Sequence, residues 1–120
     1  MKLRDVLATV NGIAVINRID MDLEVHKGVG ADLMSDVLRF GGEGMLLVTG
    51  LTNPQVIRTA EMVGIPALLF VRAKLPPPET IALAQEAGIA LLATQYTMYE
   101  SSGLLYKNGL GGIGPCGEYE

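Results

Sequence analysis

Four short apolar runs, each beginning directly after a glycine, constrain the fold of this chain most strongly. They cover residues 13–16, 45–48, 65–71 and 89–93. Apolar runs of this length without polar alternation are typical of strands that are covered on both faces, as in a parallel sheet. All four are much shorter than the about 20 apolar residues that a membrane span requires. We therefore expect buried strands and no membrane-spanning segment.

Helical periodicity fills the stretches between these runs. Asn53 and Pro54 are typical of a helix start, because asparagine caps free N–H groups and proline at the first helical position loses no hydrogen bond. Gly64 suits the left-handed residue that ends such a helix. Two apolar stripes at helical spacing are able to pack on a sheet: Leu33, Val37 and Leu38, and Val56, Ile57, Ala60 and Val63. The alternation of strand and helix predicts an α/β protein.

An internal repeat strengthens this prediction. Residues 54–70 and 78–94 align without gaps at an offset of 24 positions. The alignment pairs Pro54 with Pro78, Ile57 with Ile81, Ala60 with Ala84, Gly64 with Gly88, Ile65 with Ile89 and Leu68 with Leu92. Each copy reads as helix, turn and strand, so the two copies predict right-handed crossovers in a mainly parallel sheet flanked by helices.

The two ends of the chain are expected to differ in order. A helical stripe over residues 3–10 ends at Gly12, residues 18–22 form a connection, and residues 24–29 are compatible with another strand. The last helix is predicted over 97–107. Residues 110–120 are too rich in glycine to be ordered alone. We therefore predict one α/β domain over 1–109 and a glycine-rich tail over 110–120.

Composition excludes several classes of function. The chain has 120 residues, a net charge of −4, one cysteine (Cys116) and one histidine (His26). A disulfide scaffold and a closed zinc site therefore cannot be assembled within it, and a reducing, cytoplasmic setting fits best. The acidic balance argues against nucleic-acid binding, which draws on clustered Lys and Arg. The residues also show no export signal, metal set or cofactor motif.

The segment from Val48 to Pro54 is the best candidate for a ligand site. It leaves a buried strand and enters a helix, and free N–H groups at a helix start favour an anion or phosphate. Thr49, Gly50, Thr52 and Asn53 are its candidate ligand residues; the alternative is an ordinary capped turn. Arg72 and Lys74 follow the next strand and should lie at the same sheet edge, either as phosphate ligands or as solvated charges.

A second candidate segment contains Asp32, Ser35 and Asp36. We expect Asp32 or Ser35 to cap the helix that follows, with a place in the ligand site as the alternative. No histidine is spaced to activate a serine, and choosing freely among thirteen Asp and Glu gives no acid–base pair. The sequence therefore predicts a protein that is not an enzyme.

These residues resemble a known family, the DRTGG domain, over about residues 3–109. The matching segments are 30–37, 46–50, 52–57, 78–79, 84–89, Thr94 and 97–100. The chain departs from the pattern at one turn, where Arg72-Ala73 stands in place of the Thr-Gly-Gly type turn of many relatives. DRTGG domains occur as modules in CBS-domain inorganic pyrophosphatases and some phosphotransacetylases, and as free-standing proteins, some encoded beside hydrogenase genes. Their fold is similar to the N-terminal domain of HPr kinase/phosphorylase.

The resemblance implies a regulatory α/β module that forms dimers and has no catalysis of its own. Our first hypothesis is a homodimer that senses a small anionic or adenine-nucleotide-like ligand at the carboxyl ends of its strands. The alternative is a protein-interaction module that regulates a redox (hydrogenase-type) or phosphoryl-transfer enzyme without a small ligand. The surplus of apolar residues, including Met34, Met62, Met98, Leu104 and Leu105, is expected to close the interface between subunits.

Overall fold

The computed structural model describes residues 1–119 and contains five helices and five strands within them. The helices are α1 (Leu3–Val10), α2 (Met34–Phe40), α3 (Pro54–Val63), α4 (Pro78–Ala87) and α5 (Met98–Lys107). The strands are β1 (Ile13–Ala14), β2 (Lys27–Gly30), β3 (Met45–Thr49), β4 (Ala67–Phe70) and β5 (Ala90–Ala93). None of the helices over 1–119 is long and apolar enough to cross a membrane.

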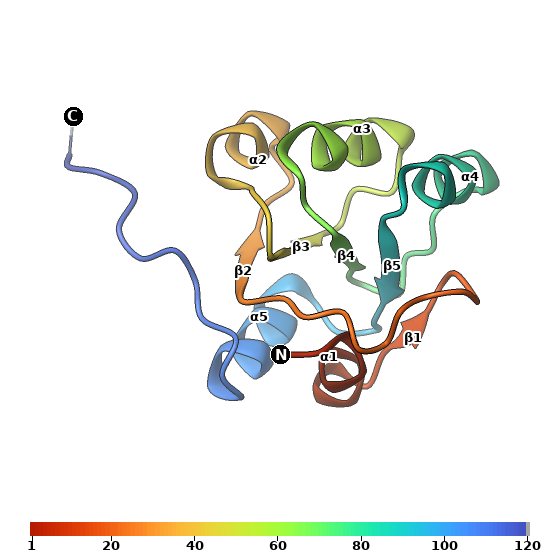
Figure 1. Cartoon of the computed structure of the whole chain (residues 1–120). Helices are drawn as coiled ribbons and strands as arrows, with labels where there is room; N and C mark the ends of the chain where they lie inside the picture. The colour runs from red at the N-terminus through yellow and green to blue at the C-terminus, as the bar shows by residue number, and fades with distance from the viewer. Residues whose placement is uncertain (120) are drawn as a thin grey trace.

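One sheet forms the middle layer, with strand order β1-β5-β4-β3-β2. The strands from β2 to β5 are parallel, whereas β1 pairs antiparallel to β5 at the edge. Helices α2, α3 and α4 cover one face of this sheet, and α1 and α5 cover the other (Figure 1). The predicted α/β class with a mainly parallel sheet is confirmed.

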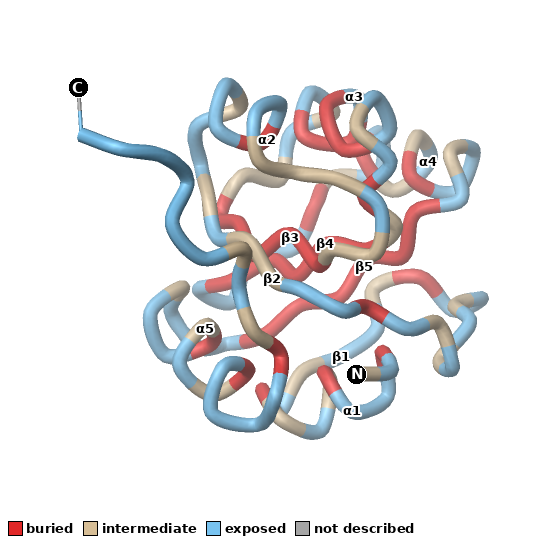
Figure 2. The backbone as a smooth tube through the Cα atoms, turned by 60° about the vertical axis from the view of Figure 1, so that its left-hand side comes forward, coloured by how far each residue is buried: buried red, intermediate tan, exposed pale blue. Residues whose placement is uncertain are grey.

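Alternate residues of the strands belong to two separate hydrophobic cores, one on each face of the sheet. Leu46 and Val48 of β3 pack with Leu3 and Val6 of α1, whereas Leu47 packs with the α3 side. Figure 2 shows the resulting burial, with β3, β4 and β5 buried in the centre and exposed stretches on the helices, in the loops and along the C-terminal tail. This burial on both faces explains why the strands lack polar alternation.

The internal repeat corresponds to two successive helix–strand units, α3–β4 and α4–β5. Both helices end at glycines in the left-handed conformation, Gly64 with φ 83° and Gly88 with φ 73°. In each case the glycine N–H donates to carbonyls of the last turn, as expected for this type of helix end. Asn53 caps α3 as predicted, since its side chain accepts from the Val56 N–H at 3.3 Å.

The first apolar run behaves differently from the other three. We expected residues 13–16 to be buried on both faces, but β1 covers only Ile13 and Ala14, both exposed. This prediction is wrong because β1 lies at the sheet edge and pairs on one side only, with β5. From this run, Ile16 alone is buried in the core.

Three of the apolar residues that we expected at a subunit interface pack inside the subunit instead. Leu105 is buried, and Met34 and Met98 pack against the two cores. Met62 on α3 is the exception, with 74% of its surface exposed. The subunit interface therefore stays a prediction, and these residues support it less than their number suggested.

The start of the predicted tail lies against β2. Leu110 is buried, and the Gly28 N–H at the free edge of β2 donates to the Gly111 carbonyl at 2.8 Å. The chain beyond Gly112 then runs away from the body of the molecule (Figure 1), and Cys116 is exposed there. The boundary at residue 109 stays a prediction.

Candidate functional site

The carboxyl ends of β2, β3 and β4 bring most of the predicted site residues to one edge of the sheet. Asp32 follows β2, Thr49 ends β3, and Arg72 follows β4 by two residues. The three strands are neighbours in the sheet and run in the same direction. Segments that are far apart in the sequence therefore meet here, as the parallel arrangement predicted.

Asp32 fastens the loop after β2 to the end of β3. Its Oδ1 atom accepts from the Thr49 hydroxyl at 2.9 Å and from the Gly50 N–H at 2.8 Å. Thr49 is fully buried, and its own Oγ1 accepts from the Leu51 N–H at 3.2 Å. A carboxylate is a strong acceptor for such donors. This network fixes the path of the chain from β3 toward α3.

The expected capping role of Asp32 and Ser35 is wrong. Helix α2 begins after Leu33, and no side chain accepts a hydrogen bond at this helix start. Asp32 precedes the cap position, so its carboxylate reaches β3 instead. Ser35 lies in the first turn of α2 and is exposed.

Arg72 lies over Gly50 and adopts a strained backbone conformation. Arg72 and Ala73 have φ values of 63° and 58°, in the left-handed region that favours glycine. Their N–H groups donate to the carbonyls of Tyr96 and Thr94 at 2.8 and 2.9 Å, which holds the turn on the loop after β5. The backbone therefore takes a shape suited to the glycines of the Thr-Gly-Gly type turn, although two other residues stand here.

The guanidinium of Arg72 contacts the place where Gly50 lacks a side chain. A Cβ atom on residue 50 would lie only 3.1 Å from Arg72 Cζ and 3.2 Å from Nε. Within residues 1–119 Arg72 takes part in no salt bridge, since the ion pairs found there join Asp22 to Lys2 and Arg4. The Arg72 guanidinium is therefore not paired with a carboxylate within the described part of the chain.

Thr52 and Asn53 occupy the turn between β3 and α3. The Thr52 carbonyl accepts from the buried Thr80 hydroxyl at 2.8 Å, which ties this turn to α4. The Asn53 side chain is engaged in capping α3. Lys74 is exposed in the loop that carries Arg72. The arrangement offers an anion the Arg72 guanidinium, whereas the Asn53 cap already occupies the Val56 N–H at the start of α3.

The described part of the chain contains no group of three or more His, Cys, Asp or Glu that is able to hold a metal. His26 lies beside Gly44 at the opposite end of β2 and β3, and its backbone N–H donates to the Gly44 carbonyl at 2.7 Å.

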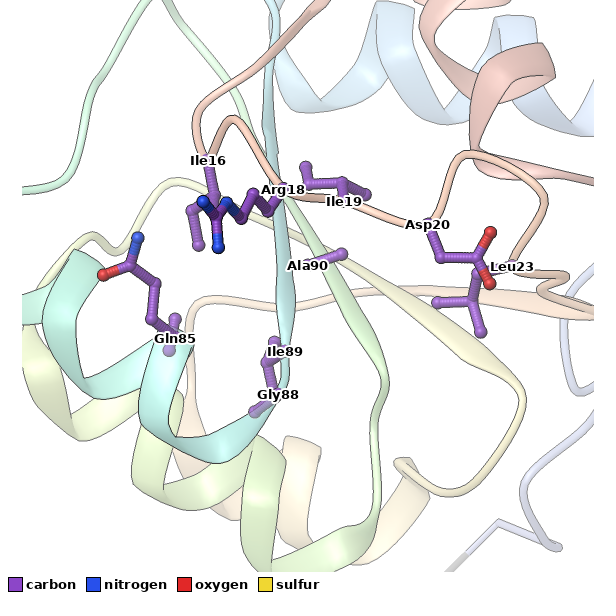
Figure 3. Close-up of a pocket in the computed structure, with 10 residues that line it drawn as sticks. Ile16, Arg18, Ile19, Asp20, Leu23, Gln85, Gly88, Ile89 and Ala90 are labelled. Carbon is purple, nitrogen blue, oxygen red and sulfur yellow. The ribbon is translucent and has the colours of Figure 1, made fainter.

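Thr49, Gly50, Thr52 and Asn53 line none of three hollows found in the surface of residues 1–119. One of about 400 Å³ lies at the amino end of β5, between α4 and the loop over 16–23. Arg18 and Gln85 lie on one side of it, and Asp20 and Leu23 lie at the other (Figure 3). A small one of about 100 Å³ separates α5 from β2.

The third hollow, of about 410 Å³, lies at the carboxyl end of β5. Asn11, Ile13, Leu75 and Gln95 line it, and the sequence analysis missed all four. The only signal available in the sequence was the pair Asn11-Gly12, which marks a turn.

Comparison with known proteins is informative at the level of the fold. No family model and no curated protein matches the chain. Among solved structures, it is similar to the CBS and DRTGG domains of the regulatory region of Clostridium perfringens pyrophosphatase, solved in complex with the activator diadenosine tetraphosphate. The TM-score is 0.69 at 16% identity, over 94% of this chain and 51% of that one.

The protein is thus a single α/β domain with a DRTGG-like fold. It spans about half the length of the pyrophosphatase structure that it matches. That structure is a regulatory region and not a catalytic one.

Proposed function

We propose that this chain is a regulatory module that binds a small anionic or nucleotide-like ligand at the carboxyl ends of β2, β3 and β4. The observation that carries the proposal is the Arg72 guanidinium, which lies close to Gly50 in the connection between β3 and α3 and makes no salt bridge within residues 1–119. A guanidinium without a carboxylate partner suits a phosphate, because its N–H groups donate charge-assisted hydrogen bonds to the phosphate oxygens.

The remaining predicted residues serve this site in different ways. Asp32 and Thr49 hold the loop in place through their hydrogen bond. Gly50 leaves room for the guanidinium, and Thr52 is tied to α4 through its carbonyl. Asn53 keeps α3 capped, and exposed Ser35 stands at the start of α2. The regulatory character of the pyrophosphatase region with the same fold supports a sensing role without catalysis.

Calorimetric titration with AMP, ADP, ATP and inorganic phosphate tests this function. We expect Arg72→Gln to weaken binding of the phosphate-bearing ligand about tenfold, since a hydrogen bond to a charged group contributes about 1.5–3 kcal/mol. Arg18→Gln is the matched control, because Arg18 lies at the opposite edge of the sheet beside β5. The proposal fails if none of these compounds gives heat at high protein concentration, or if the two variants bind equally well.

The protein-interaction alternative is supported by a different observation. Leu38 on α2 and Met62 on the neighbouring α3 are 47% and 74% exposed. In this alternative, a partner redox or phosphoryl-transfer enzyme covers these side chains. A purified partner should then lose affinity for a Leu38→Ser/Met62→Ser variant and keep it for Thr52→Ala; the opposite pattern contradicts the alternative.

Homodimer formation belongs to the same proposal. Met62 is its main support, because Met34, Met98 and Leu105, which were also expected at an interface, pack inside the subunit. Sedimentation equilibrium measures this directly, and a strict monomer at high concentration contradicts it.

A further inference from the structure

The hollow at the carboxyl end of β5 lies where the connections of the sheet diverge. The chain leaves β4 toward α4 on one face of the sheet, and it leaves β5 toward α5 on the other (Figure 1). Neighbouring parallel strands whose connections part in this way open a crevice between their carboxyl ends, and open α/β sheets bind ligands there. The connections after β2 and β3 all stay on one face, so this crevice is formed beside β5.

The walls of this hollow come from both sides of β5. Ile13 belongs to β1 and Leu75 to the loop after β4, and these two elements flank β5 in the sheet order. Both side chains are strongly exposed, at 58% and 62% of their surface. Its volume of about 410 Å³ is within the range of small-molecule sites. Exposed aliphatic side chains on two walls suit a flat apolar ring between them.

The polar groups of the hollow carry no charge. Its lining contains two side-chain amides, Asn11 and Gln95, and no charged residue. An amide offers a donor and an acceptor side by side, which matches the donor–acceptor edge of a nucleobase. Thr94 adds no further donor, because its hydroxyl donates to the Val10 carbonyl at 2.7 Å. The lining therefore selects an uncharged ligand group and gives an anion no partner.

Backbone strain is concentrated at the same place. Among residues 1–119, three that are not glycine have positive φ: Asn11 at 49°, Arg72 at 63° and Ala73 at 58°. Asn11 and Ala73 line the hollow, and Arg72 is adjacent in sequence. Such conformations are costly and cluster at binding sites, where surrounding contacts maintain them. Here the hydrogen bonds from residues 72 and 73 to the loop after β5 do so.

We infer that this hollow binds the uncharged, planar base of a purine nucleoside, between Ile13 and Leu75 and within reach of the Asn11 and Gln95 amides. The inference rests on the proposed function and extends it, since Arg72 is adjacent in sequence to Ala73 of the hollow and its guanidinium lies close to Gly50. It is nevertheless separable from that function, because a nucleoside without phosphate tests the base site alone. Nothing in it depends on the hollow beside Arg18.

Adenosine is the probe, and binding is measured by calorimetry on the full chain. We expect Leu75→Ala to weaken adenosine binding about tenfold through lost apolar contact, and Gln95→Leu to weaken it similarly. Leu38→Ala is the control for the first change, as an exposed leucine on α2. Gln85→Leu is the control for the second, and it also reports on the hollow at the amino end of β5.

The outcomes separate the two proposals. Adenosine binding that falls in Leu75→Ala and Gln95→Leu but stays within twofold of wild type in Arg72→Gln supports the base site. Absence of adenosine binding, or equal loss in the control variants, overturns it. Binding of AMP that depends on Arg72 while adenosine does not bind would leave the proposed function standing and remove the base site alone.

Discussion

Replacing Asp32 distinguishes two roles for this residue. One is to join the loop after β2 to the end of β3, and the other is to cap α2, as its position in the sequence suggests. Serine is as good a helix cap as aspartate, so Asp32→Ser would leave the stability unchanged if residue 32 capped α2. In the structure, however, the carboxylate accepts from the buried Thr49 hydroxyl and the Gly50 N–H. A serine side chain ends one atom earlier and does not reach both donors. We therefore expect the free energy of unfolding to fall.

The expected loss follows from these two bonds. Hydrogen bonds to a charged group contribute about 1.5–3 kcal/mol each, but Asp32 is exposed, so water replaces part of this in the variant. We expect a net loss of about 2 kcal/mol, which for a domain of this size lowers the melting temperature by roughly 6–12 °C. Urea unfolding followed by circular dichroism measures the loss.

The control is Asp36→Ser, which removes a carboxylate from the exposed first turn of the same helix. The reasoning is refuted if Asp32→Ser and Asp36→Ser differ by less than about 0.5 kcal/mol, which is the usual spread of surface substitutions. A double-mutant cycle with Thr49→Val should then also show no coupling, whereas our account predicts a clear one.

Three further changes probe the turn after β4, the α1–β1 turn and the ion pair of α1. Ala73→Gly should raise stability by about 0.5–1 kcal/mol in urea unfolding, because glycine adopts the left-handed conformation without strain. Gly12→Ala should lower the melting temperature markedly, because its Cβ would lie 2.7 Å from the Ala93 carbonyl oxygen. The hydrogen bond and charge of Arg4 lower the pKa of Asp22, so their pairing stabilises the fold above about pH 4 and is lost as pH falls through the lowered pKa. Asp22→Asn should therefore be slightly less stable than wild type in thermal unfolding at pH 7 and equally stable in strong acid.

Matched controls exist for the two backbone changes. Ala82→Gly in α4 should cost about 1 kcal/mol, the opposite sign to Ala73→Gly. Gly103→Ala should be tolerated, since a Cβ there meets no atom within 4 Å. A stabilising effect at position 82, or equal effects at positions 12 and 103, would contradict the account. For Asp22→Asn, a stability difference from wild type that grows as the pH falls would also contradict the account.

The parts of the fold that the sequence predicted well depend on local chemistry. The capping asparagine at position 53 and the left-handed glycines at 64 and 88 act within a few residues of themselves, so their roles are visible without the tertiary structure. The edge position of β1, in contrast, depends on tertiary structure and is not visible in the local sequence. Ile13 belongs to an apolar run like the buried ones, and only the antiparallel pairing with β5 leaves it exposed.

The site was predictable only in part for the same reason. The carboxyl edge followed from parallel strands, but the bond between Asp32 and Thr49 joins residues 17 positions apart and depends on the pairing of β2 with β3. The hollow beside β5 is assembled from three separate segments. Their meeting depends on β1 packing at the edge and on the turn at Arg72, neither of which has a local signature.

Amide chemical-shift mapping with AMP tests the central claim most directly, because it locates a ligand without assuming where it binds. The account predicts saturable shifts at Gly50, Thr52 and Arg72, which Arg72→Gln abolishes while the spectrum stays that of a folded protein. Shifts confined to Arg18 and Gly88 at the opposite edge of the sheet, or no shifts at millimolar AMP, would contradict it.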